Sequence, residues 1–225
     1  MSNKTAPPRP APRLYLATPI VSDPAPLAAQ LPGLLAGADI AAVLVRLKQT
    51  DPRSMTTIVK ALAPAIQGAG AALLIDGHAD LVARGGADGA HLSGIEALDE
   101  ALPALRPDRI AGVGALTTRH DSMSAGERGA DYVLFGEPDA NGIRPSADAI
   151  AERLSWWAEL FEPPCVGYAA TREEAVDFVA AGADFILADN LIWQDPRGPA
   201  AALAELGAAI KAAYTAPTTV AAGHG

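Results

Sequence analysis

The chain has 225 residues, of which 50% are apolar, and a formal net charge of −9. An acidic chain with only 5% aromatic residues lacks the basic surface and stacking groups that nucleic-acid binding needs, so this class is excluded. Because no apolar stretch is long enough to cross a membrane and Cys165 is the lone cysteine, we expect a cytoplasmic protein that contacts neither membrane nor nucleic acid.

Eight short apolar runs alternate with stretches of helical spacing along the chain. Continuous apolar runs of this length are typical of strands buried on both faces. We predict strands at 13–17, 40–47, 72–76, 89–92, 110–114, 132–135, 165–168 and 185–188. The helices are predicted at 24–36, 52–67, 79–84, 95–105, 119–128, 146–161, 172–181 and 199–213. Strict alternation over eight units predicts an α/β fold of the TIM (β/α)8 barrel type.

An open, doubly wound sheet is the alternative fold. Such a sheet usually carries a Gly-rich phosphate turn after its first strand. Here residues 18–22 read Thr-Pro-Ile-Val-Ser and contain no Gly, which favours the barrel.

The tripeptide Gly-Ala-Asp occurs four times, at 37–39, 86–88, 129–131 and 182–184, and an apolar run follows each copy. We predict that each Gly ends a helix in the left-handed conformation, which only Gly adopts at low cost. The four copies then mark the entries to strands 2, 4, 6 and 8, on the face opposite the chemistry.

The barrel is predicted to form one domain over residues 13–214. Residues 1–12 are Pro-rich and are expected to be a disordered tail, and residues 215–225 a flexible one. Cys165 begins an apolar strand and is expected to be an inert core residue. Exposed Trp156, Trp157 and Trp193 on Ala-rich helices would be compatible with a homodimer.

Reactive groups in such barrels lie at the C-terminal ends of the strands. Arg46 and Lys48 follow strand 2, with a spacing that points both to one side. One interpretation is an anchor for phosphate or carboxylate, and the other is a salt bridge to Asp76 or Glu96 that closes the rim.

Two further groups of candidates follow from the same rule. Asp76 and Glu96 lie on neighbouring strand ends and are predicted as ligands of a Mg²⁺ ion, while His91 is either a proton-transfer group or a packed, hydrogen-bonded side chain. The predicted catalytic residues are Arg46, Lys48 and His91, and the predicted substrate contacts are Arg46, Lys48, Asp76, Thr117, Arg144, Tyr168 and Asn190.

Several segments resemble the thiamine-phosphate synthase family, which includes thiazole tautomerases. The resemblance spans Leu-Tyr-Leu-Ala-Thr at 14–18, Gly-Ala-Asp-Gly-Ala-His-Leu-Ser at 86–93, Gly-Ala-Asp-Tyr-Val at 129–133 and Ala-Gly-Ala-Asp at 181–184. It implies a TIM barrel and a transferase of thiamine biosynthesis that binds small phosphorylated heterocycles and Mg²⁺. In the family, the residues that match Arg46 and Lys48 hold diphosphate.

Other family motifs are replaced in this chain. Gly77 stands where the family has a magnesium-binding Asp, and Glu96 is the stand-in for the second ligand. Residues 114–116 replace a Ser-Thr-His segment, residues 168–170 replace a Gly-Gly pair that holds the thiazole phosphate, and Asp189 with Asn190 replaces a small residue and Ser. The changes at 114–116, 168–170 and 189–190 remove a donor or add negative charge near polyanionic substrates.

Three functions are therefore considered. The first is a thiamine-phosphate synthase with an altered site, which condenses hydroxymethylpyrimidine diphosphate with thiazole phosphate. The second is a non-catalytic ligand-binding or regulatory paralogue of the family. The third is an isomerase that acts on a less charged substrate, with His91, Glu96 or Tyr168 transferring protons.

Overall fold

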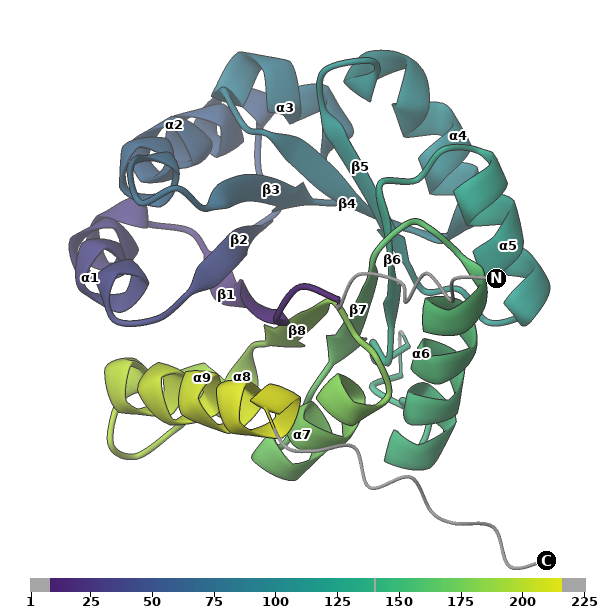
Figure 1. Cartoon of the computed structure of the whole chain (residues 1–225). Helices are drawn as coiled ribbons and strands as arrows, with labels where there is room; N and C mark the ends of the chain where they lie inside the picture. Colours follow the sequence, from purple (N-terminus) through teal and green to yellow (C-terminus); the bar gives the residue numbers. More distant parts are fainter. Residues whose placement is uncertain (1–8, 140, 216–225) are drawn as a thin grey trace, which may run out of the picture.

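The computed structural model describes residues 9–139 and 141–215, which form a closed barrel of eight parallel strands in sequential order. The helices surround the barrel on its outside, as Figure 1 shows. The strands are β1 (Arg13–Val21), β2 (Ile40–Leu47), β3 (Ala72–Asp76), β4 (Gly89–Ser93), β5 (Ile110–Gly114), β6 (Tyr132–Phe135), β7 (Cys165–Tyr168) and β8 (Phe185–Ala188). The predicted TIM barrel is confirmed.

Nine helices connect or follow these strands within the described residues. They are α1 (Pro24–Ala36), α2 (Pro52–Gly68), α3 (Ala79–Gly85), α4 (Gly94–Leu105), α5 (Arg119–Glu127), α6 (Ala147–Leu160), α7 (Arg172–Ala180), α8 (Asn190–Trp193) and α9 (Pro199–Thr215). The short helix α8 was not predicted, because four residues carry no helical periodicity. No helix in the described part of the chain has the length and apolar character to cross a membrane.

Side-chain caps fix where several helices begin. Asp23 accepts the backbone N–H of Ala25 at 3.0 Å, and Asp51 accepts that of Ser54 at 2.9 Å. In both cases Pro occupies the first helical position, where a backbone N–H would have no partner inside the helix.

Strand β1 is longer than predicted at its C-terminal end. After a register shift between Ala17 and Ile20, the chain pairs again with β2, with Ile20 opposite Arg46 and Val21 opposite Leu47. The buried Thr18 hydroxyl accepts the backbone N–H of Arg46 at 3.1 Å across this irregularity. The shift thus fixes the end of β2, where the predicted cation lies.

The Gly-Ala-Asp joints follow the prediction at three of four positions. Gly86, Gly129 and Gly182 have φ angles of 75°, 89° and 94°, whereas Gly37 ends α1 with a φ of −90°. The prediction was wrong for Gly37, because its N–H bonds to the Leu34 carbonyl in a tight right-handed turn.

The Asp of each of these three joints accepts a backbone N–H from the preceding strand. Asp88 accepts from Leu73 at 2.7 Å, Asp131 from Ala111 at 2.7 Å and Asp184 from Cys165 at 2.8 Å. In the remaining copy, Asp39 forms an exposed ion pair with Arg13. The repeated tripeptide therefore joins adjacent strands at the N-terminal end of the barrel.

The core has two parts. The larger lies between the sheet and the helices, and a smaller cluster fills the inside of the barrel with residues such as Tyr15, Leu44 and Tyr132. Trp157 belongs to the outer core and is fully buried, so the prediction that it is exposed was wrong; its indole N–H donates to the Pro163 carbonyl at 2.7 Å.

The ends of the predicted domain lie at the limits of the described residues. Residues 1–8 of the predicted N-terminal tail and 216–225 of the C-terminal one fall outside them. Arg9, within the predicted N-terminal tail, donates to the Gly182 carbonyl at 2.6 Å, so its side chain contacts the barrel.

Candidate functional site at the C-terminal mouth of the barrel

Strand alternation brings several predicted residues to the inside of the barrel. Leu44, Leu74 and Leu187 belong to the inner cluster. Side chains two residues further along each strand face the same way. Arg46, Asp76 and Asp189 occupy these positions and meet at the mouth.

Arg46 is the central cation of this mouth. Its Nη1 lies 2.9 Å from Oδ2 of Asp189, and its Nε lies 3.9 Å from Oδ2 of Asp76. Burial by itself lowers the pKa of Arg46, but the hydrogen bond and charge of Asp189 outweigh it and raise the pKa. The predicted rim salt bridge to Asp76 exists, together with a shorter one to Asp189, a residue that was not among the predicted site residues.

His91 lies below the mouth at the centre of a buried hydrogen-bonded chain. Its Nε2 is 3.0 Å from Oε1 of Glu137, and its Nδ1 is 3.0 Å from the Tyr132 hydroxyl, which in turn lies 2.9 Å from the Tyr15 hydroxyl. Burial alone would lower the pKa of His91, but the charge and hydrogen bond of Glu137 raise it. The structure therefore supports a packed His that is also ionically paired.

Glu137 completes this arrangement from the loop after β6. Its Oε2 accepts the backbone N–H of Ala115 at 2.9 Å. Ala115 has a φ of 52°, an unusual conformation for a residue with a Cβ atom. Burial acts to raise the pKa of Glu137, but pairing with His91 lowers it. Glu137 was not predicted as a site residue, although the strand-end rule points to it.

Asp76 is the least tightly paired carboxylate near the centre of the mouth. It lies opposite His91 in the β3–β4 register, and its side chain is 38% exposed. Burial raises its pKa, with His91 and Arg46 acting in the opposite direction.

A preformed metal cage is absent from the described residues, which contain no cluster of three or more His, Cys, Asp or Glu side chains suited to a metal ion. Glu96 is exposed in the first turn of α4, at the same rim as Asp76. Mg²⁺ typically takes only one or two carboxylates and completes its shell with water and substrate phosphates. The role of Asp76 and Glu96 as ligands of Mg²⁺ stays a prediction.

Arg144 ties the loop after β6 to the end of β7. Its Nη1 lies 3.0 and 2.9 Å from the two carboxylate oxygens of Glu174. Its remaining donors reach the carbonyls of Gly136 at 3.0 Å and Tyr168 at 2.7 Å. This predicted substrate contact is thus held by contacts within the chain.

Tyr168 lies inside the barrel beside Arg144 and Asp189. The Arg144 guanidinium lies 5.4 Å from the centre of its ring. Burial and the neighbouring Asp189 carboxylate raise the pKa of Tyr168 to about 12. The phenol is therefore neutral near neutral pH.

Three other predicted residues lie at the rim and not in its centre. Thr117 donates its hydroxyl to Asp121, 3.1 Å away, near the start of α5. Asn190 begins α8, and its backbone N–H bonds to Asp189. Lys48 is exposed after β2 and lines a separate cavity of about 470 Å³ with Ser54 of α2. The structure therefore does not bring Lys48 and Arg46 into one cluster.

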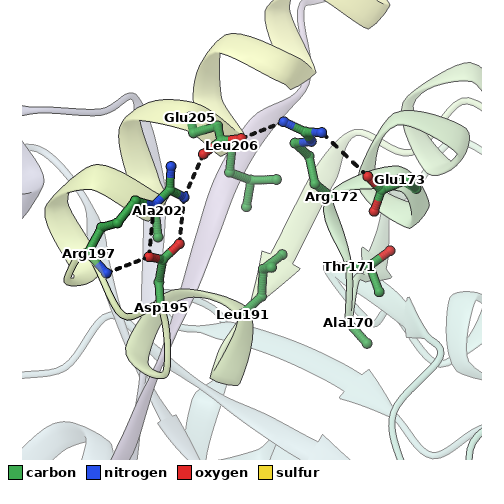
Figure 2. Close-up of a pocket in the computed structure, with 10 residues that line it drawn as sticks. All are labelled: Ala170, Thr171, Arg172, Glu173, Leu191, Asp195, Arg197, Ala202, Glu205 and Leu206. Atoms are coloured by element: carbon green, nitrogen blue, oxygen red, sulfur yellow. Dashed lines mark hydrogen bonds and ion pairs between the residues drawn. The ribbon is translucent and has the colours of Figure 1, made fainter.

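Two cavities adjoin the mouth. One of about 430 Å³ lies between the β5 and β6 loops and includes Thr117, Glu137 and Arg144. The second, of about 300 Å³, lies between the β7–α7 loop and α9. Figure 2 shows that its charged side chains pair with each other, in the order Asp195, Arg197, Glu205, Arg172 and Glu173.

Comparison with known proteins identifies relatives over most of the chain. A family model described as thiamine monophosphate synthase matches residues 14–189. A thiamine-phosphate synthase of Rhodospirillum centenum is 40% identical over 196 residues, covering 86% of this chain and 95% of the relative. A thiamine-phosphate synthase of Hyphomonas neptunium is 37% identical over 210 residues, covering 88% of this chain and 94% of the relative.

Solved structures agree with this result at the level of the fold. A thiamine phosphate pyrophosphorylase from Pyrococcus furiosus superposes with a TM-score of 0.71 at 21% identity, covering 89% of this chain and 96% of that chain. The family match and the two relatives, taken with the barrel, lead to one conclusion: the chain belongs to the thiamine monophosphate synthase family.

Proposed function

We propose that this protein is a thiamine-phosphate synthase, which joins hydroxymethylpyrimidine diphosphate to thiazole phosphate. The observation that carries the proposal is the inward-facing Arg46 at the mouth of a barrel of this family, 2.9 Å from Asp189 and 3.9 Å from Asp76. A guanidinium in this position suits a diphosphate, because it offers several N–H donors and a charge that is always present.

The reaction needs negative charge to be neutralised as the diphosphate departs. The ring nitrogen of the thiazole then attacks the pyrimidine-methyl cation, so the protein supplies mainly charge and orientation. We assign the leaving diphosphate to Arg46. Lys48 lines a separate cavity at the rim, and its contact with the diphosphate stays a prediction. Asp76 and Glu96 would hold a Mg²⁺ ion, which when bound adds positive charge beside the diphosphate. The cytoplasmic location remains a prediction.

Turnover with both substrates and Mg²⁺ tests the proposal, with thiamine phosphate measured by chromatography. Arg46→Gln is expected to lower kcat/KM by about 100-fold or more, since a donor to the leaving group is lost. Arg128→Gln is the matched control, because it also breaks an Arg–Asp ion pair, but on the outside with Asp99. Absence of product above the uncatalysed background, or equal effects of the two substitutions, would contradict the proposal.

A second function is favoured by the buried His91–Glu137 pair. A His held between a carboxylate and a Tyr hydroxyl is suited to moving protons, which supports an isomerase that acts on a less charged heterocycle. Proton exchange between a thiazole ligand and D₂O, followed by NMR, measures this activity. Both His91→Gln and Glu137→Gln should abolish the exchange, whereas Glu159→Gln on the outer helix α6 should not.

A further inference from the structure

Phosphate sites in TIM barrels are frequently built from the loops after strands 7 and 8. Their donors are backbone N–H groups and nearby cations. In this chain the corresponding N–H after β7 belongs to Ala170, and it already donates to Oε2 of Glu174 at 2.8 Å. The Glu174 carboxylate thus accepts the hydrogen bond of a backbone N–H that a bound phosphate would otherwise use.

The Glu174 carboxylate also forms an ion pair with the nearest cation, Arg144. Both oxygens of Glu174 lie within 3.0 Å of Nη1 of Arg144, and the Glu174 side chain is only 16% exposed. Nε and Nη2 of Arg144 donate to the carbonyls of Gly136 and Tyr168. The positive charge of Arg144 is therefore balanced by Glu174 before any ligand binds.

The loop after β8 repeats this arrangement. Asp189 accepts the backbone N–H of Asn190 and lies 2.9 Å from Nη1 of Arg46. Its side chain is 8% exposed, and the hydrogen bond from Arg46 contributes to lowering its pKa against the effect of burial. At two neighbouring strand ends, then, one carboxylate engages both a backbone donor and an Arg.

We propose that Glu174 and Asp189 are specificity-determining residues that weaken the binding of phosphate groups at the β7 and β8 end of the mouth. An incoming dianion must displace a carboxylate from its Arg or accept its repulsion, whereas an uncharged polar group does neither. The mouth consequently discriminates less between a phosphate ester and the corresponding alcohol. This inference rests on the proposed function only in taking the mouth as the substrate site.

Titration calorimetry with inorganic phosphate tests the proposal without any turnover. Glu174→Gln and Asp189→Asn should each bind phosphate about tenfold more tightly than the unmodified protein, and the double variant more tightly still. Glu173→Gln is the control, because it removes the same charge at the neighbouring position, where the Glu173 side chain is 73% exposed. The phosphate affinity of this variant should stay within about twofold of that of the unmodified protein.

The two single variants act at separate loops, so one remains informative if the other unfolds; circular dichroism checks that each is folded. Phosphate affinities of both variants equal to or weaker than that of Glu173→Gln would overturn the proposal. Tighter phosphate binding without any synthase product would retain this inference and reject the proposed function. Synthase activity together with unchanged phosphate binding in the variants would overturn this inference and retain the proposed function.

Discussion

Nε2 of His91 lies 3.0 Å from Oε1 of Glu137, and this contact joins the buried interior of the barrel to its mouth. His91 is 1% exposed, whereas the Glu137 side chain is 22% exposed. The two groups hold each other in their charged forms, because each shifts the pKa of the other in that direction.

The stability of the protein should depend on pH through this pair. The pKa of His91 is raised from 6.5, so its contribution is complete below 6.5 and is lost as pH rises through the higher folded value. The pKa of Glu137 is lowered from 4.5, so its contribution is complete above 4.5 and is lost as pH falls through the lower folded value. The pair stabilises most between these limits.

Urea unfolding from pH 4 to 9 measures the effect. Glu137→Gln should lower the free energy of unfolding by about 1–3 kcal/mol near pH 5.5, because it removes a charged hydrogen-bond partner, and by less above the folded pKa of His91. Glu159→Gln, an exposed acid on α6, should cost less than about 0.5 kcal/mol. If Glu137→Gln lowered the free energy of unfolding by the same amount at every pH, the His91–Glu137 pair would not be the source of the pH dependence.

Gly114 makes the His91–Glu137 contact possible. A Cβ atom at this position would lie 1.7 Å from Oε2 of Glu137 and 2.9 Å from Nε2 of His91. Gly114→Ala should therefore expel the Glu137 carboxylate and lower the pKa of His91, since its raised value depends on that partner. NMR titration of the His91 ring measures this shift.

Gly33→Ala is the matched control for that experiment. Gly33 lies within α1, and an added Cβ atom there meets nothing within 4 Å. Ala in a helix interior should stabilise the protein by about 0.5–1 kcal/mol and leave the His91 titration unchanged. An unchanged pKa of His91 in Gly114→Ala would show that Glu137 does not set it.

Cys165 should be chemically inert in the folded protein. Burial raises the pKa of its thiol to about 12, and the residue is fully buried at the start of β7. Because the thiolate is the reactive species, we expect no labelling by a thiol reagent at pH 8 within the time that denatured protein is labelled completely. Rapid labelling under conditions where circular dichroism shows a folded protein would contradict this.

The sequence predicted the barrel because its evidence is local and repeated. Continuous apolar runs mark strands buried on both faces, and caps such as Asp51 mark where helices begin. Trp157 was misjudged because one of its neighbours in space, Phe135, lies on β6 and not on the helix that carries Trp157. A pattern along one helix does not reveal which side a second element will cover.

The site was predicted only in part, for a related reason. The strand-end rule located Arg46, Asp76 and His91 at or just below the mouth, because alternation along a strand determines which side chains face inward. Glu137 also follows a strand end, but its pairing with His91 was not predicted. Glu174 was missed because it lies in the first turn of α7. Their contacts depend on loop conformation, which carries no periodic signal.

The Asp of the repeated tripeptide should stabilise the barrel where it accepts a buried N–H. Asp184 accepts the N–H of Cys165 at 2.8 Å, so Asp184→Ala leaves that donor without its partner and should cost about 1–3 kcal/mol in urea unfolding. Asp39→Ala is the control within the same repeat, because its 74% exposed side chain pairs only at the surface with Arg13, an interaction that contributes about 1 kcal/mol or less. Equal losses in the free energy of unfolding for the two variants would mean that the hydrogen bond between Asp184 and the strand does not contribute to stability. A larger loss for Asp184→Ala would identify the tripeptide as a device that joins adjacent strands.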